Sequence, residues 1–396
     1  MFNLDILPGH EYYGYMQTSL YIHFPFCLKK CLYCDFNSVA DARVAPAEYV
    51  AALLREMELR AATLPEKTFA PTLYFGGGTP SLMEPELVGS LIDAAARLFG
   101  LEADAEVTIE ANPGTLTREK LAGYRLAGVN RLSLGVQSFD DATLSLLGRV
   151  HTAREALDAF SAARGAGFAN IGIDLIHSLP GQTPAMWRSA LERATGLAPE
   201  HVSAYGLSIE EGTPFFRMEE RGELPLPDEE EAAAMFRETG ETLGRNGFEH
   251  YEISNFARPG FRSRHNQVYW RRGNYLGFGA GAHSFLRTPG FGVRWKNPDA
   301  VAPYLVAVAA SLLPEEDRQL LALRDALSEA FFLGLRLLEG VDLSSLVCEF
   351  GPAVEEYFAA PIRELTGQGL LTESAGRLHL SSRAIIFANR VFSRFV

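Results

Sequence analysis

An alternation of short apolar runs with helix-like segments dominates the first half of the chain. The runs have the apolar and β-branched composition of buried strands, and they are Leu20–His23, Thr72–Phe75, Glu106–Glu110, Arg131–Gly135, Asn170–Leu175 and His201–Leu207. Segments with apolar residues at helical spacing separate them, such as Tyr49–Leu59 and Pro85–Phe99. Repeated βα units form a parallel sheet, so the pattern predicts an α/β fold with a partial (βα)6 barrel of the TIM type. In such barrels, binding residues lie at the carboxyl ends of the strands.

The second half of the chain predicts a smaller accessory module. A helix over Glu229–Arg245 is followed by a stretch rich in glycine and aromatic residues, Tyr251–Asn297, which we expect to be irregular. Two helical runs follow, and then the order helix, turn, helix, hairpin, helix, which resembles a winged-helix module of α+β type. We therefore divide the chain into an N-terminal tail (1–18), a partial barrel (19–247), a linking region (248–313) and a C-terminal winged-helix-like domain (314–396).

Composition limits the classes of partner. With 396 residues, of which 47% are hydrophobic, the chain can bury a large core in more than one domain. The 36 basic and 49 acidic residues give a net charge of −13, which argues against binding to nucleic acid or to an anionic membrane surface. The DNA-binding interpretation of the winged-helix-like module is weak for the same reason. Few cysteines and no recognisable targeting segment or membrane span lead us to expect a cytoplasmic protein.

Three cysteines lie close together near the start of the predicted barrel. Cys27, Cys31 and Cys34 have the spacing C-x3-C-x2-C, and thiolates this close in sequence can converge on an iron–sulfur cluster. A cluster normally takes four protein ligands, but the remaining cysteine, Cys348, is more than three hundred residues away. We expect Cys348 to be a small buried hydrophobic residue. Three thiolates would leave one iron open to a small molecule, as in a catalytic or ligand-binding metal site.

Two other interpretations of the cysteines compete with a cluster. A disulfide framework is disfavoured because the local number of cysteines is odd and the chain has few of them. A zinc site is a better rival, with His23 or a distant side chain as the fourth ligand. Against zinc, no second pair of cysteine or histidine residues follows at the spacing typical of zinc fingers.

Polar residues follow successive predicted strands. The second strand leads into Gly76–Thr79, whose three glycines allow the backbone to approach a ligand closely. Glu110 ends the third strand, Gln137 ends the fourth with Arg149 soon after it, and Asp174 lies at the end of the fifth. Each residue alone would be interpreted as a polar group at the surface or the edge of the core. Together, at successive strand ends, they predict a binding site.

The cysteine loop after the first strand and the glycine-rich turn after the second resemble the radical S-adenosylmethionine superfamily. The resemblance implies a [4Fe-4S] cluster bound by Cys27, Cys31 and Cys34, with the methionine end of S-adenosylmethionine on the fourth iron. The cofactor would supply the radical chemistry, and the protein would supply position and exclusion of water. The positions that the resemblance assigns to the cofactors are Tyr21, Tyr33, Gly77, Gly78, Thr79, Glu110, Gln137, Arg149 and Asp174.

Four segments indicate which family within the superfamily the chain resembles. They are Leu20–Cys27, Gly76–Pro80, Arg131–Gln137 and Leu179–Gln182. They are similar to the oxygen-independent coproporphyrinogen III oxidase family, and the similarity runs from about Ser19 to the C-terminus. Two departures separate the chain from the oxidases. Phe36 stands where they have a further cysteine, and only 26 residues precede the first cluster cysteine, where they have a longer segment. Both departures are typical of the HemW-type heme chaperone branch of the family.

A second motif implies a heme ligand. The segment His265-Asn-Gln-Val-Tyr-Trp270 resembles the proposed heme-binding motif of the chaperones, which makes His265, Tyr269 and Trp270 candidates for heme contact. Histidine is a common axial ligand of heme iron, and aromatic rings can pack against the macrocycle. In the alternative interpretation, His265 and His283 are hydrogen-bonded loop residues beside the cluster cavity. The resemblance also implies heme-accepting partners, among them membrane respiratory enzymes that would bring the protein to the membrane surface. Whether the chain forms a homodimer is left undecided.

The sequence therefore favours a heme chaperone with a [4Fe-4S] cluster and S-adenosylmethionine. The main alternative is a true oxidase that decarboxylates the propionate side chains of coproporphyrinogen III, so enzymatic activity is left undecided. A radical enzyme acting on RNA is disfavoured by the net charge of −13 and by the lack of a basic accessory domain. A zinc-bearing binding protein is the remaining alternative.

Overall fold

The structure, a computed structural model, describes residues 16–40, 43–64 and 68–396, so most of the predicted tail (1–18) lies outside the described residues. The predicted strands are all present: β2 (Ser19–Phe24), β3 (Thr68–Gly77), β4 (Leu101–Ala111), β5 (Arg131–Gln137), β6 (Ile171–His177) and β7 (His201–Gly206). Each pairs in parallel with the next one in chain order, and the short strand β1 (Met16–Gln17) pairs with β3. The partial barrel with an α/β fold is confirmed.

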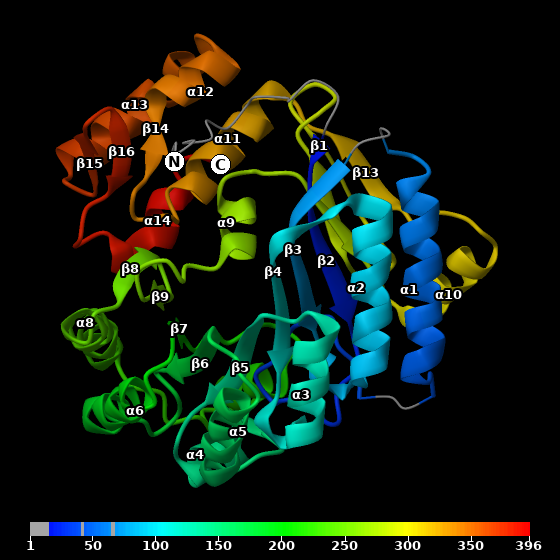
Figure 1. The fold of residues 1–396 in the computed structure, drawn as a ribbon. Helices are drawn as coiled ribbons and strands as arrows, with labels where there is room; N and C mark the ends of the chain where they lie inside the picture. Colours follow the sequence, from blue (N-terminus) through cyan, green and yellow to red (C-terminus); the bar gives the residue numbers. More distant parts are fainter. Residues whose placement is uncertain (1–15, 41–42, 65–67) are drawn as a thin grey trace, which may run out of the picture.

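Helices cover the outer face of this curved sheet (Figure 1). They are α1 (Pro46–Ala61), α2 (Pro85–Phe99), α3 (Arg118–Ala127), α4 (Asp141–Leu147), α5 (Ala153–Gly165), α6 (Pro184–Gly196) and α8 (Glu229–Arg245). The short helix α7 (Pro214–Glu220) packs instead against the loop after β2, where the Phe215 amide donates to the Leu32 carbonyl. Local sequence defines several of their ends, because α5 and α8 begin with capping boxes and α1, α2 and α6 begin with a proline in the first turn.

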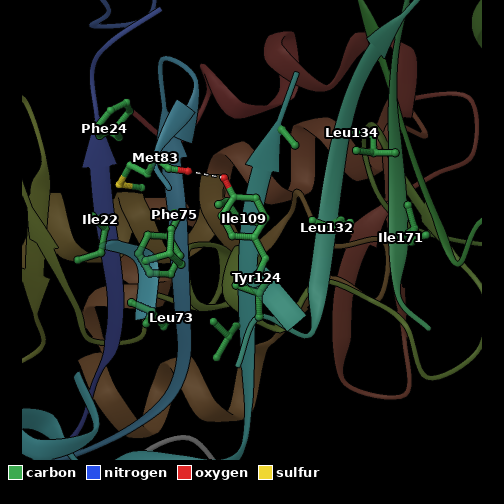
Figure 2. Packing of buried hydrophobic residues seen from close by; sticks show 14 of the residues in the cluster. Ile22, Phe24, Leu73, Phe75, Met83, Ile109, Tyr124, Leu132, Leu134 and Ile171 are labelled. Atoms are coloured by element: carbon green, nitrogen blue, oxygen red, sulfur yellow. Dashed lines mark hydrogen bonds between the residues drawn. The ribbon is translucent and has the colours of Figure 1, made fainter. Parts of the chain in front are cut away.

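The core lies between the outer face of the sheet and these helices. Phe75, Ile109 and Leu132, from three neighbouring strands, are fully buried there (Figure 2). In Figure 2 the Tyr124 hydroxyl of α3 also donates a hydrogen bond of 2.6 Å to the Met83 carbonyl, which ties a buried ring to the loop before α2. Because side chains alternate along a strand, the residues between these apolar positions face the inside of the barrel.

The linking region is more regular than the sequence predicts. It contains β8 (Glu249–Glu252), β9 (Asn255–Ala257), α9 (Arg264–Trp270), β10 (Tyr275–Phe278), β11 (His283–Leu286), β12 (Val293–Lys296) and α10 (Val301–Ala309). Strands β9 and β8 extend the sheet beyond β7, whereas β10 pairs with β2 and is followed by β11, β12 and β13 (Glu316–Leu320). The expectation of an irregular stretch was wrong because strands of three or four residues, interrupted by glycines, are too short to show a period.

The C-terminal module has its own three-stranded antiparallel sheet and its own hydrophobic core. Its elements are α11 (Leu323–Gly334), β14 (Val341–Asp342), α12 (Leu343–Phe350), α13 (Ala353–Gly367), β15 (Leu371–Ser374), β16 (Arg377–Leu380), the 3-10 turn η3 (Ile385–Phe387) and α14 (Ala388–Phe392). This order confirms a smaller α+β unit after the barrel. The expectation for Cys348 was wrong, since its side chain is exposed on α12. It lies two residues from the buried Leu346 and Phe350, which places it on the opposite side of the helix.

A buried carboxyl group connects α1 to the turn after β10. Glu56 is fully buried and accepts hydrogen bonds from the Gly279 amide (2.8 Å), the Tyr304 hydroxyl (2.8 Å) and the Asn297 side-chain amide (2.7 Å). Burial raises the pKa of Glu56 from 4.5 to about 7, although the three hydrogen bonds oppose the shift. The folded protein therefore binds the Glu56 proton more tightly than the unfolded chain.

This pKa shift predicts a pH dependence of stability. A carboxyl group whose pKa is raised on folding stabilises the folded state below the unfolded value and loses that effect as pH rises through the folded value. Between pH 5 and pH 8 the Glu56 contribution should fall by roughly 2.5 kcal/mol. Urea unfolding at both pH values should show this loss in the wild type, and Glu56→Gln should lack it. Glu58→Gln is the matched control because Glu58 is exposed on the same helix; equal pH dependence in all three proteins would contradict the assignment.

Candidate cofactor-binding site

A cavity of about 480 Å³ lies inside the barrel, open toward the carboxyl ends of the strands. The strand alternation explains its lining, because Tyr74, Ser133 and Asp174 line it while their neighbours in the strands are buried in the core. The structure brings almost all of the residues that the sequence predicts into this cavity: Cys27, Cys31, Tyr33, Cys34, Gly77, Gly78, Thr79, Glu110, Gln137, Arg149 and Asp174.

The cysteine loop follows β2 and presents its thiols to the cavity. The Cys27 sulfur accepts a hydrogen bond from the Thr79 hydroxyl, and the Cys31 sulfur accepts one from Arg149, each at 3.4 Å. Such donors stabilise a thiolate, the form that binds iron. No three histidine, cysteine, aspartate or glutamate side chains in the described residues are grouped so that they could hold a single metal ion. Cluster cysteines bind different irons, so they need only face the same space.

The glycine-rich turn packs directly against the cysteine loop. The Gly78 amide donates to the Phe24 carbonyl (2.8 Å), and the Thr79 amide donates to the Phe26 carbonyl (2.9 Å). A Cβ atom on Gly78 would stand 2.7 Å from the Pro25 carbonyl oxygen, a contact that only backbone movement could relieve. The turn therefore needs glycine to approach the loop, as the sequence predicts.

Two carboxyl groups and one guanidinium line the cavity beside the cysteines. Glu110 accepts a hydrogen bond of 2.8 Å from the Tyr74 hydroxyl, and burial raises the pKa of Glu110 to about 7. Asp174 accepts from the Ser133 hydroxyl at 2.9 Å, and burial raises the pKa of Asp174 as well. The Nε atom of Arg149 is buried and has no partner among the described residues. These acceptors and donors suit a ligand that carries ammonium, hydroxyl and carboxylate groups, as S-adenosylmethionine does.

Tyr21 and His265 do not line the main cavity but lie behind its wall. The Tyr21 hydroxyl is 3.0 Å from Nδ1 of His23, and its ring stacks on Tyr74 and His265. His265 is 1% exposed, its Nδ1 lies 2.7 Å from the Thr72 hydroxyl, and its Nε2 lies 2.8 Å from the Tyr269 hydroxyl. Burial lowers the pKa of His265 to about 3. Both ring nitrogens are thus engaged within the protein.

The rest of the histidine motif divides between two cavities. Tyr269 and Trp270 line a second cavity of about 260 Å³, together with residues of β10 and α11. Asn266, which the sequence analysis passed over, lines the main cavity instead. His283, the other loop histidine considered, is exposed at the start of β11.

Sequence reasoning missed the far end of the main cavity. Arg131 and His201 are the first residues of β5 and β7, and both line it although they are almost fully buried. The available signal was a charged or polar residue opening an apolar strand. Because binding residues are expected at the other end of a parallel barrel, that signal was not interpreted as part of a site.

Comparison with known proteins identifies the family. Residues 21–194 match the model of the radical SAM superfamily, and residues 321–387 match the HemN C-terminal domain. The chain is 38% identical to heme chaperone HemW of Lactococcus lactis, over 96% of this chain and 97% of that one. It is 37% identical to heme chaperone HemW of Bacillus subtilis, over 96% and 99%. The chain belongs to the HemW family.

The HemW protein of Escherichia coli is 35% identical, over 96% of this chain and 98% of that one. Among solved structures, coproporphyrinogen III oxidase (HemN) from Escherichia coli, a radical SAM enzyme, superimposes with a TM-score of 0.83 at 25% identity, over 97% of this chain and 91% of that one. Membership of the radical SAM superfamily gives the cofactors, a [4Fe-4S] cluster and S-adenosylmethionine. Across residues 16–40, 43–64 and 68–396, we find no helix with the length and apolar character needed to cross a membrane.

Proposed function

We propose that this protein is a heme chaperone, which binds heme and delivers it to acceptor proteins. The observation that carries the proposal is the match to proteins named heme chaperone HemW, at 35–38% identity over nearly the whole of both chains. Phe36 supports the same branch, since its ring is exposed at the cavity where the oxidases have a further cysteine.

The site residues form part of the proposal. Cys27, Cys31 and Cys34 ligate the cluster, while Thr79 and Arg149 donate hydrogen bonds to two of the thiolates. Glu110, Gln137 and Asp174 hold the polar groups of S-adenosylmethionine against the glycine turn, and Tyr33 lines the same cavity. Tyr21, behind the cavity wall, supports the site through its ring contact with Tyr74. When bound, the two cofactors supply one-electron chemistry; the residues of the chain position them and exclude water.

The proposed heme contacts lie around α9. His265 can reach iron only after it gives up its hydrogen bond to Thr72 or to Tyr269, so ligation requires a local rearrangement. Tyr269 and Trp270 already face a cavity whose aromatic and apolar side chains suit the edge of a macrocycle. Two arginines also line it, and Glu329 in the same lining is ion-paired with both of them. The alternative, in which His265 has a purely structural role in the barrel wall, predicts that its removal leaves heme binding unchanged.

Heme titration of the anaerobically reconstituted protein tests this assignment. His265→Ala should weaken heme binding at least about ten-fold and alter the heme absorption band. Tyr269→Phe keeps the ring but releases Nε2 of His265, so it should bind heme at least as well as the wild type. His379→Ala is the control, because His379 lies in the C-terminal hairpin. If His265→Ala binds heme with the affinity of the wild type, the heme site lies elsewhere in the protein.

The wider setting also belongs to the proposal. We place the protein in the cytoplasm and its heme acceptors among membrane respiratory enzymes. We divide the chain at 18/19, 247/248 and 313/314. Separate hydrophobic cores for the barrel and the C-terminal unit support a boundary near 313/314. The boundary at 247/248 has no such support, because Phe248, Leu276 and Trp295 of the linking region belong to the core of the barrel. A second candidate function, decarboxylation of coproporphyrinogen III, is favoured by the superposition on the Escherichia coli oxidase.

A further inference from the structure

The main cavity reaches well beyond the cofactor residues. Arg131 begins β5 and Gln137 ends it, a span of about 20 Å along the strand. Around the far end, which we call the barrel floor, the cavity is lined by Arg131, His201, Ser263 and Asn266. Ser263 caps α9 and Asn266 lies in its first turn, so the helix closes the barrel at this end. The proposed cofactor contacts leave the barrel floor without a role.

One ring nitrogen of His201, on the barrel floor, has no hydrogen-bond partner among the described residues. The residue is 1% exposed, and burial together with the nearby Arg131 charge lowers the pKa of His201 well below its usual value, so the ring is neutral. Its Nε2 lies 2.8 Å from the Tyr251 hydroxyl, which also accepts a hydrogen bond from the Ser263 amide. Of the two tautomers of the His201 ring, we take the one in which the Tyr251 hydroxyl donates to Nε2. The ring proton then belongs on Nδ1, which has no partner in the described residues.

The unpaired Nδ1 faces the space above a glycine. Gly172 pairs with His201 across β6 and β7 and with Ser133 across β5 and β6. A Cβ atom on Gly172 would stand 3.5 Å from Nδ1 of His201, an ordinary contact distance. Glycine thus leaves a slot in the barrel wall, bounded by the His201 ring and by the Leu132 carbonyl oxygen at 3.6 Å. A group placed there must accept a hydrogen bond.

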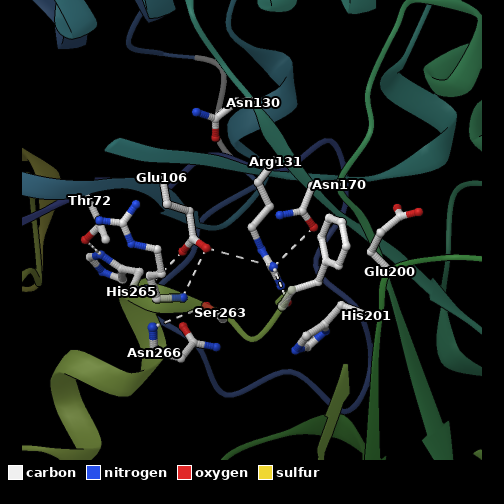
Figure 3. A network of polar contacts seen from close by, with 12 residues as sticks. Thr72, Glu106, Asn130, Arg131, Asn170, Glu200, His201, Ser263, His265 and Asn266 are labelled. Atoms are coloured by element: carbon white, nitrogen blue, oxygen red, sulfur yellow. Dashed lines mark hydrogen bonds and ion pairs between the residues drawn. The ribbon is translucent and has the colours of Figure 1, made fainter. Parts of the chain in front are cut away.

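The charges around this slot favour an anion. Arg131 is 2% exposed, and its Nη1 lies 3.3 Å from the Asn170 side-chain oxygen, 3.2 Å from the Phe261 carbonyl and 4.0 Å from Glu106 (Figure 3). Glu106 in turn accepts the backbone amides of Arg264 and His265, each at 3.0 Å, which stabilise its negative charge. Asp174, two residues beyond Gly172, is held by serine hydroxyls. The Arg131 guanidinium is therefore the cationic group that the barrel floor presents to a carboxylate, and it shares its charge with Glu106.

We propose that the barrel floor is a second ligand site, which binds a carboxylate over Gly172 through Nδ1 of His201 with Arg131 supplying the positive charge. The carboxylate belongs either to a free short-chain acid or to a side chain of a tetrapyrrole, and the slot recognises the same group in both. The ligand shares the barrel with S-adenosylmethionine but binds at the opposite end of the strands.

Saturation-transfer NMR with propionate, on the reconstituted full-length protein with S-adenosylmethionine, tests the site. The wild type should show saturable binding, and Gly172→Ala should weaken it at least about ten-fold because the methyl group fills the slot. His201→Gln should weaken it similarly. The Gly172→Ala protein should fold normally, since the added Cβ meets no contact shorter than 3.5 Å. Gly196→Ala, with no atom within 4 Å of the added Cβ, is the matched control.

The outcomes separate this inference from the proposed function. Absent binding in the wild type, unchanged binding in Gly172→Ala, or equal binding of propionamide would overturn the carboxylate site. If hemin displaces propionate and hemin dimethyl ester does not, the ligand is a tetrapyrrole carboxylate; if neither does, it is a free acid. Heme uptake, followed by absorption in the same samples, reports on the chaperone proposal independently of propionate binding.

Discussion

Cys31→Ser is expected to abolish cluster binding and, with it, the binding of S-adenosylmethionine. A serine hydroxyl is a poor iron ligand, and two thiolates cannot hold a cluster that is already one protein ligand short. Cys31 also accepts a hydrogen bond from Arg149, so its loss removes one of the connections between the cluster loop and the residues after β5. After anaerobic reconstitution with iron and sulfide, the variant should lack the broad brown absorption of the wild type and should retain little iron.

Cys348→Ser is the matched control for this experiment. Cys348 lies on the exposed side of α12, outside the cavity residues, and its replacement should leave iron content and colour unchanged. Normal colour in Cys31→Ser would defeat the three-cysteine assignment. Loss of colour in Cys348→Ser would show that a distant cysteine takes part.

Gly78→Ala should nearly eliminate cofactor binding without changing any ligand. Its Cβ would stand 2.7 Å from the Pro25 carbonyl oxygen and 2.8 Å from that of Phe26, so the glycine turn and the cysteine loop must move apart. Overpacking of this kind costs about 1–3 kcal/mol of unfolding free energy. The loop shift should also lower the affinity for S-adenosylmethionine at least about 100-fold, since site geometry tolerates only small displacements. Calorimetric titration of the reconstituted protein measures the affinity.

The control for this variant is Gly89→Ala. The added Cβ would lie 3.6 Å from the Ala127 side chain, and alanine is the better helix former within α2. Gly89→Ala should therefore bind the cofactor normally and be at least as stable as the wild type. Equal affinities in Gly78→Ala and Gly89→Ala would show that the close approach of the two loops is not needed.

The sequence predicted the barrel and the upper part of its cavity for one physical reason. In a parallel βα barrel the chain order of the strands is also their order in space, so Glu110 and Gln137 at successive strand ends must converge. Asp174 joins them from the middle of β6, not from its end as the sequence predicted, because it faces the same cavity. The cysteine loop and the glycine turn are adjacent for the same reason, because they follow the neighbouring strands β2 and β3. The local sequence pattern was therefore sufficient to predict contacts between βα units that follow one another in the chain, because such units are also neighbours in space.

Prediction failed where contacts join distant parts of the chain. Strand β10 pairs with β2 across about 250 residues of sequence, and a four-residue strand carries too little pattern to indicate its partner. The engagement of His265 by Thr72 depends on where α9 lies against β3, which no local motif specifies. The proposed role of His201 could not be predicted from the sequence. It depends on Gly172, which lies opposite His201 on the neighbouring strand and has no side chain to fill the space. The exposure of Cys348 depends on which side of α12 packs on the C-terminal core.

The central claim is that this protein carries heme rather than modifying porphyrinogen. The most direct measurement presents one anaerobically reconstituted, reduced sample with S-adenosylmethionine to two tests, heme transfer to an apo heme protein and turnover of coproporphyrinogen III. We predict stoichiometric heme uptake, transfer to the acceptor and no decarboxylated product. Decarboxylation of coproporphyrinogen III without stable heme uptake would contradict the chaperone assignment and identify the protein as an oxidase.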